Sequence, residues 1–92
     1  SETIPLPSGL STGQYFFCLS NSKPHKNLTR LVEAYRAYRK TQQNAWPLVL
    51  SSHEFRDQPG VFSLGEVPDD LASSLLRNAG GAFFPSLYEG FG

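Results

Sequence analysis

Residues 15–20 read YFFCLS, a short and unbroken apolar run that is rich in aromatic side chains. Gly13 precedes this run and Asn21 follows it, so a turn former and a polar residue bound it. A run without polar alternation is typical of a strand that is buried on both faces of a parallel sheet. Cys18 lies within the run, and we interpret its thiol as buried and inert rather than reactive.

Two helices and three further short strands are predicted after this run. The apolar pattern first predicts a helix that begins at 27 and fades at 42–44, and then strands at 48–50 and 61–64. A second helix is predicted at 68–79, where Gly80 and Gly81 end it, and a last strand at 82–85. This order predicts an α/β fold, a Rossmann-like parallel sheet with flanking helices. Only residues 52–60 separate the second and third strands, whereas a parallel crossover normally takes about 10–12 residues or more. Either these strands are not parallel neighbours, or the helical layer is missing between them.

The composition indicates one small globular domain. The chain has 92 residues, of which 39% are hydrophobic and 17% are charged. Eight basic residues balance eight acidic ones, so no electrostatic attraction to nucleic acid or to an anionic membrane follows. No apolar run approaches the roughly 20 residues of a membrane span, and a single cysteine excludes an internal disulfide. The basic end of the first helix suits the helix dipole, and we interpret it as a solvated face.

The two ends of the chain differ from its middle. Residues 1–14 are dense in proline, glycine, serine and threonine, which predicts an interdomain linker or an edge segment. Residues 15–92 then form the domain. The chain contains no methionine, and residues 88–92 stop inside what looks like a motif, so we interpret the chain as a piece of a longer protein, truncated at its C-terminal end.

Two loops follow predicted strands, where open α/β sheets place their ligands. The first, residues 20–27, leads into a helix N-terminus, whose free N–H groups could bind a phosphate with help from Lys23 and Lys26. The blander interpretation is that these lysines are solvated. In the second loop, residues 85–92, glycines let backbone N–H groups approach a ligand, and Glu89 could accept hydrogen bonds from hydroxyls. An ordinary turn with a surface carboxylate is the alternative.

Other site types find no support in the sequence. His25 and His53 are too isolated to indicate a metal site. His25 could act as a general base or contact a phosphate, but a surface loop histidine explains it as well. No nucleophile arrangement, Walker loop or Gly-x-Gly-x-x-Gly motif occurs.

Three segments together resemble one known family. Residues 15–31 resemble the strand, loop and helix that open the C-terminal donor-binding domain of group 1 glycosyltransferases, which are retaining, nucleotide-sugar-dependent enzymes of the GT-B fold. Residues 64–70 (LGEVPDD) resemble a turn of that domain, and residues 84–92 (FPSLYEGFG) resemble its signature around a glutamate and two glycines. All three segments occur in the family's order.

The resemblance implies a role for particular residues. It implies that Lys26, with Asn21 and Lys23, binds the donor diphosphate. The catalytic-site residue Glu89 would contact the donor sugar hydroxyls, and the backbone amides of Gly90, Phe91 and Gly92 would bind the sugar and its phosphate. Glu66 and Val67 would lie near the nucleotide base. It implies no metal and no cofactor, with a GDP-, UDP- or ADP-linked sugar as the substrate. A glycan or lipid-linked acceptor would bind an N-terminal domain outside this chain. The whole enzyme would work in the cytoplasm or associate peripherally with the inner face of the membrane.

Several residues depart from the family pattern. Ser20 stands where the family usually has glycine, and Asn21 where it often has arginine. The family's second glutamate would lie beyond Gly92, so we expect the isolated 92-residue piece to be inactive. These departures keep open a catalytically inactive Rossmann-like nucleotide-binding or scaffold module. A third hypothesis is another α/β nucleotide-binding domain, specific for ATP or NAD.

Overall fold

The strands and helices follow one another along the chain in the predicted order. The computed structural model describes residues 5–20 and 26–83. The elements are β1 (Phe16–Cys18), α1 (Lys26–Thr41), β2 (Leu48–Leu50), β3 (Val61–Ser63), α2 (Asp69–Asn78) and β4 (Gly81–Phe83). Neither described helix has the length and apolarity to cross a membrane.

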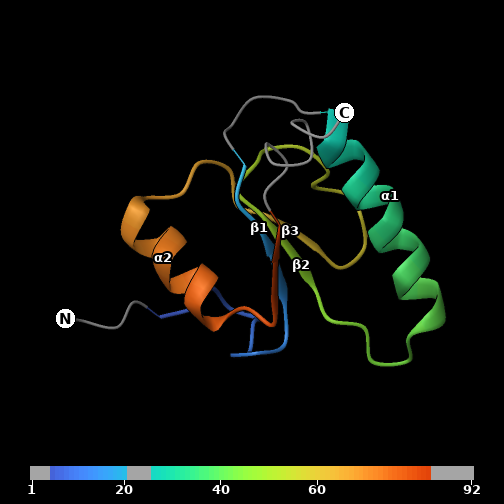
Figure 1. Cartoon of the computed structure of the whole chain (residues 1–92), viewed down its shortest axis with the longest axis horizontal. Helices are drawn as coiled ribbons and strands as arrows, with labels where there is room; N and C mark the ends of the chain where they lie inside the picture. The colour runs from blue at the N-terminus through green and yellow to red at the C-terminus, as the bar shows by residue number, and fades with distance from the viewer. Residues whose placement is uncertain (1–4, 21–25, 84–92) are drawn as a thin grey trace.

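The four strands form one parallel sheet in the order β3-β2-β1-β4. β1 lies inside the sheet, where Phe17 pairs with Val49 of β2 on one side and with Ala82 of β4 on the other. Figure 1 shows the sheet between α1 and α2. The fold is therefore the predicted α/β, Rossmann-like arrangement, and the apolar run at 15–20 supplies one of its two inner strands.

The connection between β2 and β3 decides between the two expectations for this joint. β2 and β3 are parallel neighbours, and the described residues 51–60 between them form bends and turns without a helix. The second expectation is therefore right, because the helical layer is missing there. Phe55 adopts a φ of 65°, which is strained for a bulky residue, and its side chain packs against the core beside α1. This ring occupies part of the layer that a crossover helix would otherwise fill.

Two apolar cores lie on the two faces of the sheet. The α1 side contains Cys18, Leu48 and Leu50 from the strands, and Leu28, Val32 and Tyr35 from the helix. Successive strand residues point to opposite faces, so Phe17 and Val49 instead pack on the α2 side with Tyr15 and Leu75. Cys18 has no exposed surface, which confirms the interpretation of a buried thiol, and this burial raises the pKa of the thiol to about 12.

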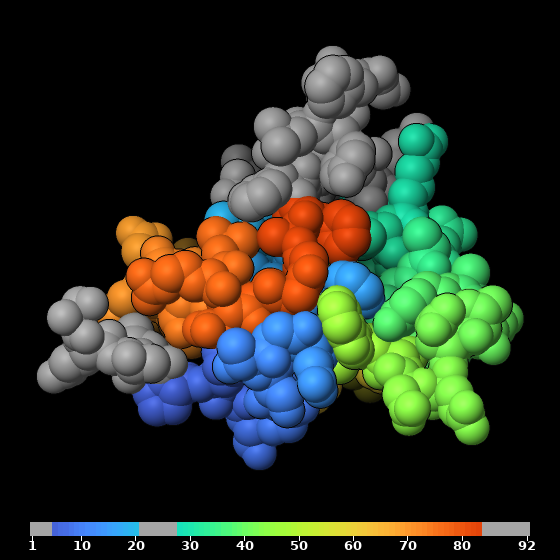
Figure 2. Space-filling model, turned by 60° about the horizontal axis from the view of Figure 1, so that its bottom comes forward, coloured from blue at the N-terminus to red at the C-terminus, as the bar shows by residue number. Residues whose placement is uncertain are grey.

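The described part of the N-terminal segment packs against the α2 side of the sheet. Leu6 and Leu10 contact that core, and the Gly13 amide donates a hydrogen bond of 2.7 Å to the Asn78 carbonyl at the end of α2. Figure 2 shows this blue segment beside the orange surface of α2. Residues 5–14 thus belong to the packed body, while their role as a linker to a second domain stays a prediction.

The end of α2 lies where the sequence predicts it. The helix ends at Asn78, and Ala79 is extended, with φ −74° and ψ 149°. Gly80 supplies a close approach, because a Cβ there would lie 2.7 Å from the Gly13 carbonyl and against the Trp46 ring. Gly81 is already the first residue of β4. The predicted helix boundary at Gly80 and Gly81 is therefore confirmed to within one residue.

Candidate functional site

The order of the strands creates one topological switch point, between β1 and β4. The chain leaves β1 for β2 on one side, whereas β4 lies on the other side and is reached through α2. Cys18 and Phe83, the last residues of the two strands, are partners in register, and the Leu19 amide donates to the Phe83 carbonyl at 3.2 Å. Doubly wound sheets bind ligands outside the carboxyl ends of the strands at such a point. The two loops that the sequence singles out both start there.

Most of the residues that the resemblance selects lie beyond the described ranges. Those outside are Asn21, Lys23, Glu89, Gly90, Phe91 and Gly92. His25, which was considered from the sequence alone, also lies outside the described residues. Lys26 is the first residue of α1, which follows β1, but its side chain is outside the description as well. The structure therefore brings together, at the level of side chains, only the remaining part of the predicted site.

That part is a hollow of about 330 Å³ at the carboxyl edge, here called the switch-point hollow. It is lined by Leu19, Ser20, Ser51, Glu66, Val67, Asp69 and Ala72. These residues come from the ends of β1 and β2, the turn after β3 and the first turns of α2. Its volume lies at the lower end of the range of small-molecule sites, about 300–1,000 Å³. Glu66 and Val67, expected near a base, thus line the same hollow as Ser20.

A pair of serines joins the ends of β1 and β2 on the floor of the site. The Ser20 amide donates to Ser51 Oγ at 2.8 Å, and Ser51 Oγ donates to the Ser20 carbonyl at 2.7 Å. Ser51 is buried, and its own amide donates to the Cys18 carbonyl at 3.3 Å. The pair fixes the backbone just before the loop that follows β1. Sequence reasoning missed Ser51, whose signal was only a serine directly after a strand.

Replacing Ser51 with alanine is expected to lower the free energy of unfolding by about 1–3 kcal/mol, because the Ser20 amide and carbonyl both lose their partner in a half-buried place. Urea unfolding followed by Trp46 fluorescence measures this loss. Ser73→Ala, on the exposed face of α2, is the matched control and should leave the stability nearly unchanged. Equal effects of the two substitutions would contradict the proposed role of the pair.

The charged residues that line the switch-point hollow, among those that the structure describes, are acidic. Glu66 and Asp69 line it, and both are exposed to solvent. Asp69 and Asp70 form the acidic first turn of α2, where negative charge stabilises the helix N-terminus. Carboxylates accept hydrogen bonds from hydroxyl and amino groups but repel phosphates. The described lining therefore suits the hydroxyl-rich or base end of a ligand, and it contains no cation that could neutralise a phosphate.

Glu54 is a further carboxylate that the sequence did not single out. It follows β2, and its backbone is fixed by a hydrogen bond from its amide to Ser52 Oγ and by one from Ser63 Oγ to its carbonyl. Its Oε2 atom is buried and has no hydrogen-bond partner within the described part of the chain. A glutamate in a polar turn belongs to no periodic pattern, so no sequence signal could have identified it.

His53 lies within hydrogen-bond distance of an arginine side chain. His53 Nδ1 lies 2.7 Å from Arg56 Nη2, and the His53 ring packs against Gly65, which has a φ of 74°. Among residues 5–20 and 26–83, no group of three His, Cys, Asp or Glu side chains could hold a metal ion. His53 therefore belongs to the architecture of the loop after β2.

Comparison with known proteins assigns no role to these residues. No protein-family model matches the chain, and neither the curated proteins nor the solved structures contain a significant match. The roles proposed below for Ser20, Glu66 and Val67 therefore rest on their place at the switch point and on the sequence resemblance.

Proposed function

We propose that this chain is the donor-binding part of a retaining glycosyltransferase of the GT-B fold, which transfers a sugar from a nucleotide-sugar to a glycan or a lipid-linked acceptor. One observation carries the proposal. β1 and β4, which lead into the two loops that resemble the family's donor loops, are adjacent at the switch point. Glu66 and Val67, from the third resembling segment, line the hollow beside them. Segments far apart in the sequence thus serve one edge of the sheet.

The proposed site divides the donor by charge. The acidic switch-point hollow takes the neutral, hydrogen-bonding end of the nucleotide, where Glu66 accepts hydrogen bonds. Lys26, with Lys23 and Asn21, holds the diphosphate beside the N-terminus of α1. A cation and oriented amides at this position stabilise the negative charge that grows on the leaving nucleotide diphosphate.

The remaining groups complete the donor site. Glu89 accepts hydrogen bonds from the sugar hydroxyls, and the amides of Gly90, Phe91 and Gly92 cradle the sugar and its phosphate. The acceptor binds an N-terminal domain in the cytoplasm or at the inner face of the membrane. The reaction takes a GDP-, UDP- or ADP-linked sugar as substrate and uses no resident cofactor.

A catalytically inactive nucleotide-binding or scaffold module is the second candidate. Two observations favour it. Ser20 places a side chain at the switch-point hollow where the family usually has glycine, and the helical layer is missing between β2 and β3. Such a module would bind a nucleotide-sugar but would not turn it over.

Titration of the chain with UDP-, GDP- and ADP-glucose, followed by NMR, tests donor binding. One of the three should shift the amide signals of Ser20, Ser51 and Val67, and Glu66→Ala should weaken its binding about three- to tenfold through a lost hydrogen bond. Asp57→Ala, an exposed carboxylate that does not line the hollow, is the matched control. Tighter binding of ATP or NAD at the same residues would overturn the proposal. Donor hydrolysis by a chain that includes the acceptor domain then separates the transferase from the inactive module.

A further inference from the structure

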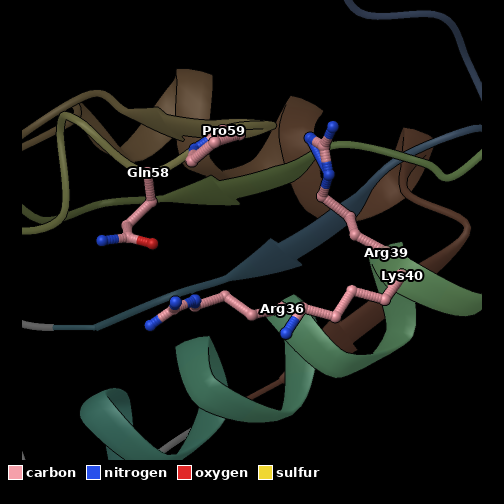
Figure 3. Close-up of a pocket in the computed structure, with 5 residues that line it drawn as sticks. All are labelled: Arg36, Arg39, Lys40, Gln58 and Pro59. Carbon is pink, nitrogen blue, oxygen red and sulfur yellow. The ribbon is translucent and has the colours of Figure 1, made fainter.

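A second, basic hollow lies on the α1 side of the molecule, between the C-terminal half of α1 and the turn before β3. It measures about 340 Å³ and is lined by Arg36, Arg39, Lys40, Gln58 and Pro59; we call it the basic hollow. Figure 3 shows the three cationic side chains coming from α1, with Gln58 and Pro59 across the space from the helix. Neighbouring parallel strands place this turn, before β3, at the amino edge of the sheet. The basic hollow is therefore separate from the switch-point hollow at the carboxyl edge.

Within the part of the chain that the structure describes, the three cations of the basic hollow lack acidic partners. None of them forms an ion pair with a carboxylate there, and no described acidic side chain lines the hollow. The helix dipole explains Arg39 and Lys40, which lie in the last turn of α1. It does not explain Arg36, which lies before the last turn. Arg36 and Lys40 are four residues apart on the same face of the helix, so their like charges repel each other. An anion between them would remove this repulsion.

The Arg39 guanidinium lies against the backbone of the opposite turn. A side chain at Gly60, which has a φ of 78°, would collide with the Arg39 guanidinium and the Tyr35 hydroxyl. The buried Tyr35 in turn lies within hydrogen-bond distance of the Trp46 carbonyl, at 2.7 Å, and the Gly60 carbonyl, at 3.3 Å. The Arg39 guanidinium therefore lies at the rim of the basic hollow, beside the Gly60 backbone.

We propose that the basic hollow binds a compact phosphorylated small molecule that carries at least two negative charges. Arginine presents N–H donors in a planar fork that fits phosphate oxygens, lysine adds a point charge, and the Gln58 amide adds a neutral donor. The chain as a whole has no net charge, and the cations surround one hollow rather than a long stripe. A small ligand therefore fits better than nucleic acid or a membrane, which are bound by extended positive surfaces. This ligand is distinct from the donor, which the proposed function places at the opposite edge of the sheet.

NMR titration of the 92-residue chain with pyrophosphate tests this site. Saturable shifts are expected for the side-chain signals of Arg36, Arg39 and Gln58. Arg36→Gln or Lys40→Gln should weaken this binding about fivefold each, the contribution of one charge-assisted contact at a solvent-exposed site. Arg77→Gln removes an exposed arginine from the last turn of α2 and should leave the affinity unchanged. Circular dichroism of every variant verifies that the fold is retained.

Three results would overturn the inference. The first is an equal loss of affinity in Arg77→Gln, which would indicate unspecific attraction. The second is a pyrophosphate titration that shifts only the backbone amides of Ser20 and Lys26, which assigns the anion to the diphosphate end of the donor site and leaves the proposed function standing. The third is binding of phosphatidylglycerol vesicles or of an oligonucleotide, through Arg36 and Lys40, without any saturable response to pyrophosphate. Failure of nucleotide-sugar binding with intact pyrophosphate shifts would instead refute the proposed function alone.

Discussion

Replacing Phe17 with alanine is expected to lower the free energy of unfolding by about 3–5 kcal/mol, the cost of removing a fully buried aromatic ring. Phe17 has no exposed surface and lies in β1, inside the sheet, where it packs with Tyr15, Val49 and Leu75. A domain of this length is typically stable by only about 5–14 kcal/mol. The substitution therefore removes at least about a fifth of the expected stability.

Phe62→Ala is the matched control for this prediction. Phe62 contributes the same side chain to the same core, but it lies on the edge strand β3 and is only half-buried. Its loss should be less than half that of Phe17. Urea unfolding followed by Trp46 fluorescence compares the two variants, since the chain has one tryptophan and its ring lies 5.1 Å from that of Phe16. A smaller loss of unfolding free energy in Phe17→Ala than in Phe62→Ala would contradict the placement of Phe17 at the centre of this core.

The fold could be predicted from the sequence where burial alone determines the pattern. The apolar run at 15–20 and the helical spacing of Leu28, Val32 and Tyr35 both reflect which side chains leave water, and each gave an element close to its observed bounds. The joint at 51–60 could not be decided in this way. Strand pairing is a tertiary property, and the left-handed Phe55 that lets the short connection close has no signature in the local sequence.

The candidate site was only partly predictable for a related reason. That ligands gather at the carboxyl ends of the strands follows from topology, which the order of elements already indicated. Glu66 and Val67 could be selected only through the family resemblance. Ser51 and Glu54 lie in short polar stretches, and their contacts depend on strands that are neighbours in space rather than in sequence. Reading such residues requires the register of β1, β2 and β3.

Lys26→Ala is expected to lower kcat/KM for the nucleotide-sugar donor about 10²–10³-fold, in a chain that includes the acceptor domain. Lys26 opens α1 directly after the loop that follows β1, so its charge adds to the positive N-terminal end of the helix dipole. Charge on the departing diphosphate is greater in the transition state than in the bound donor. The loss should therefore appear in kcat as well as in a higher donor KM, and it corresponds to about 2.7–4 kcal/mol of stabilisation.

Arg30→Ala separates this role from a general effect of positive charge near the site. Arg30 is an exposed cation one turn further along α1, where the free N–H groups of the helix end are no longer available to a phosphate. Steady-state kinetics should show at most a few-fold change for Arg30→Ala, which disappears at high salt because exposed charges are screened. Lys26→Arg should recover part of the activity, since it keeps the charge but moves it on a longer, planar side chain. Wild-type kinetics in Lys26→Ala would refute the assignment of Lys26 to the diphosphate, and the donor would then depend on Lys23 and the backbone amides for its neutralisation.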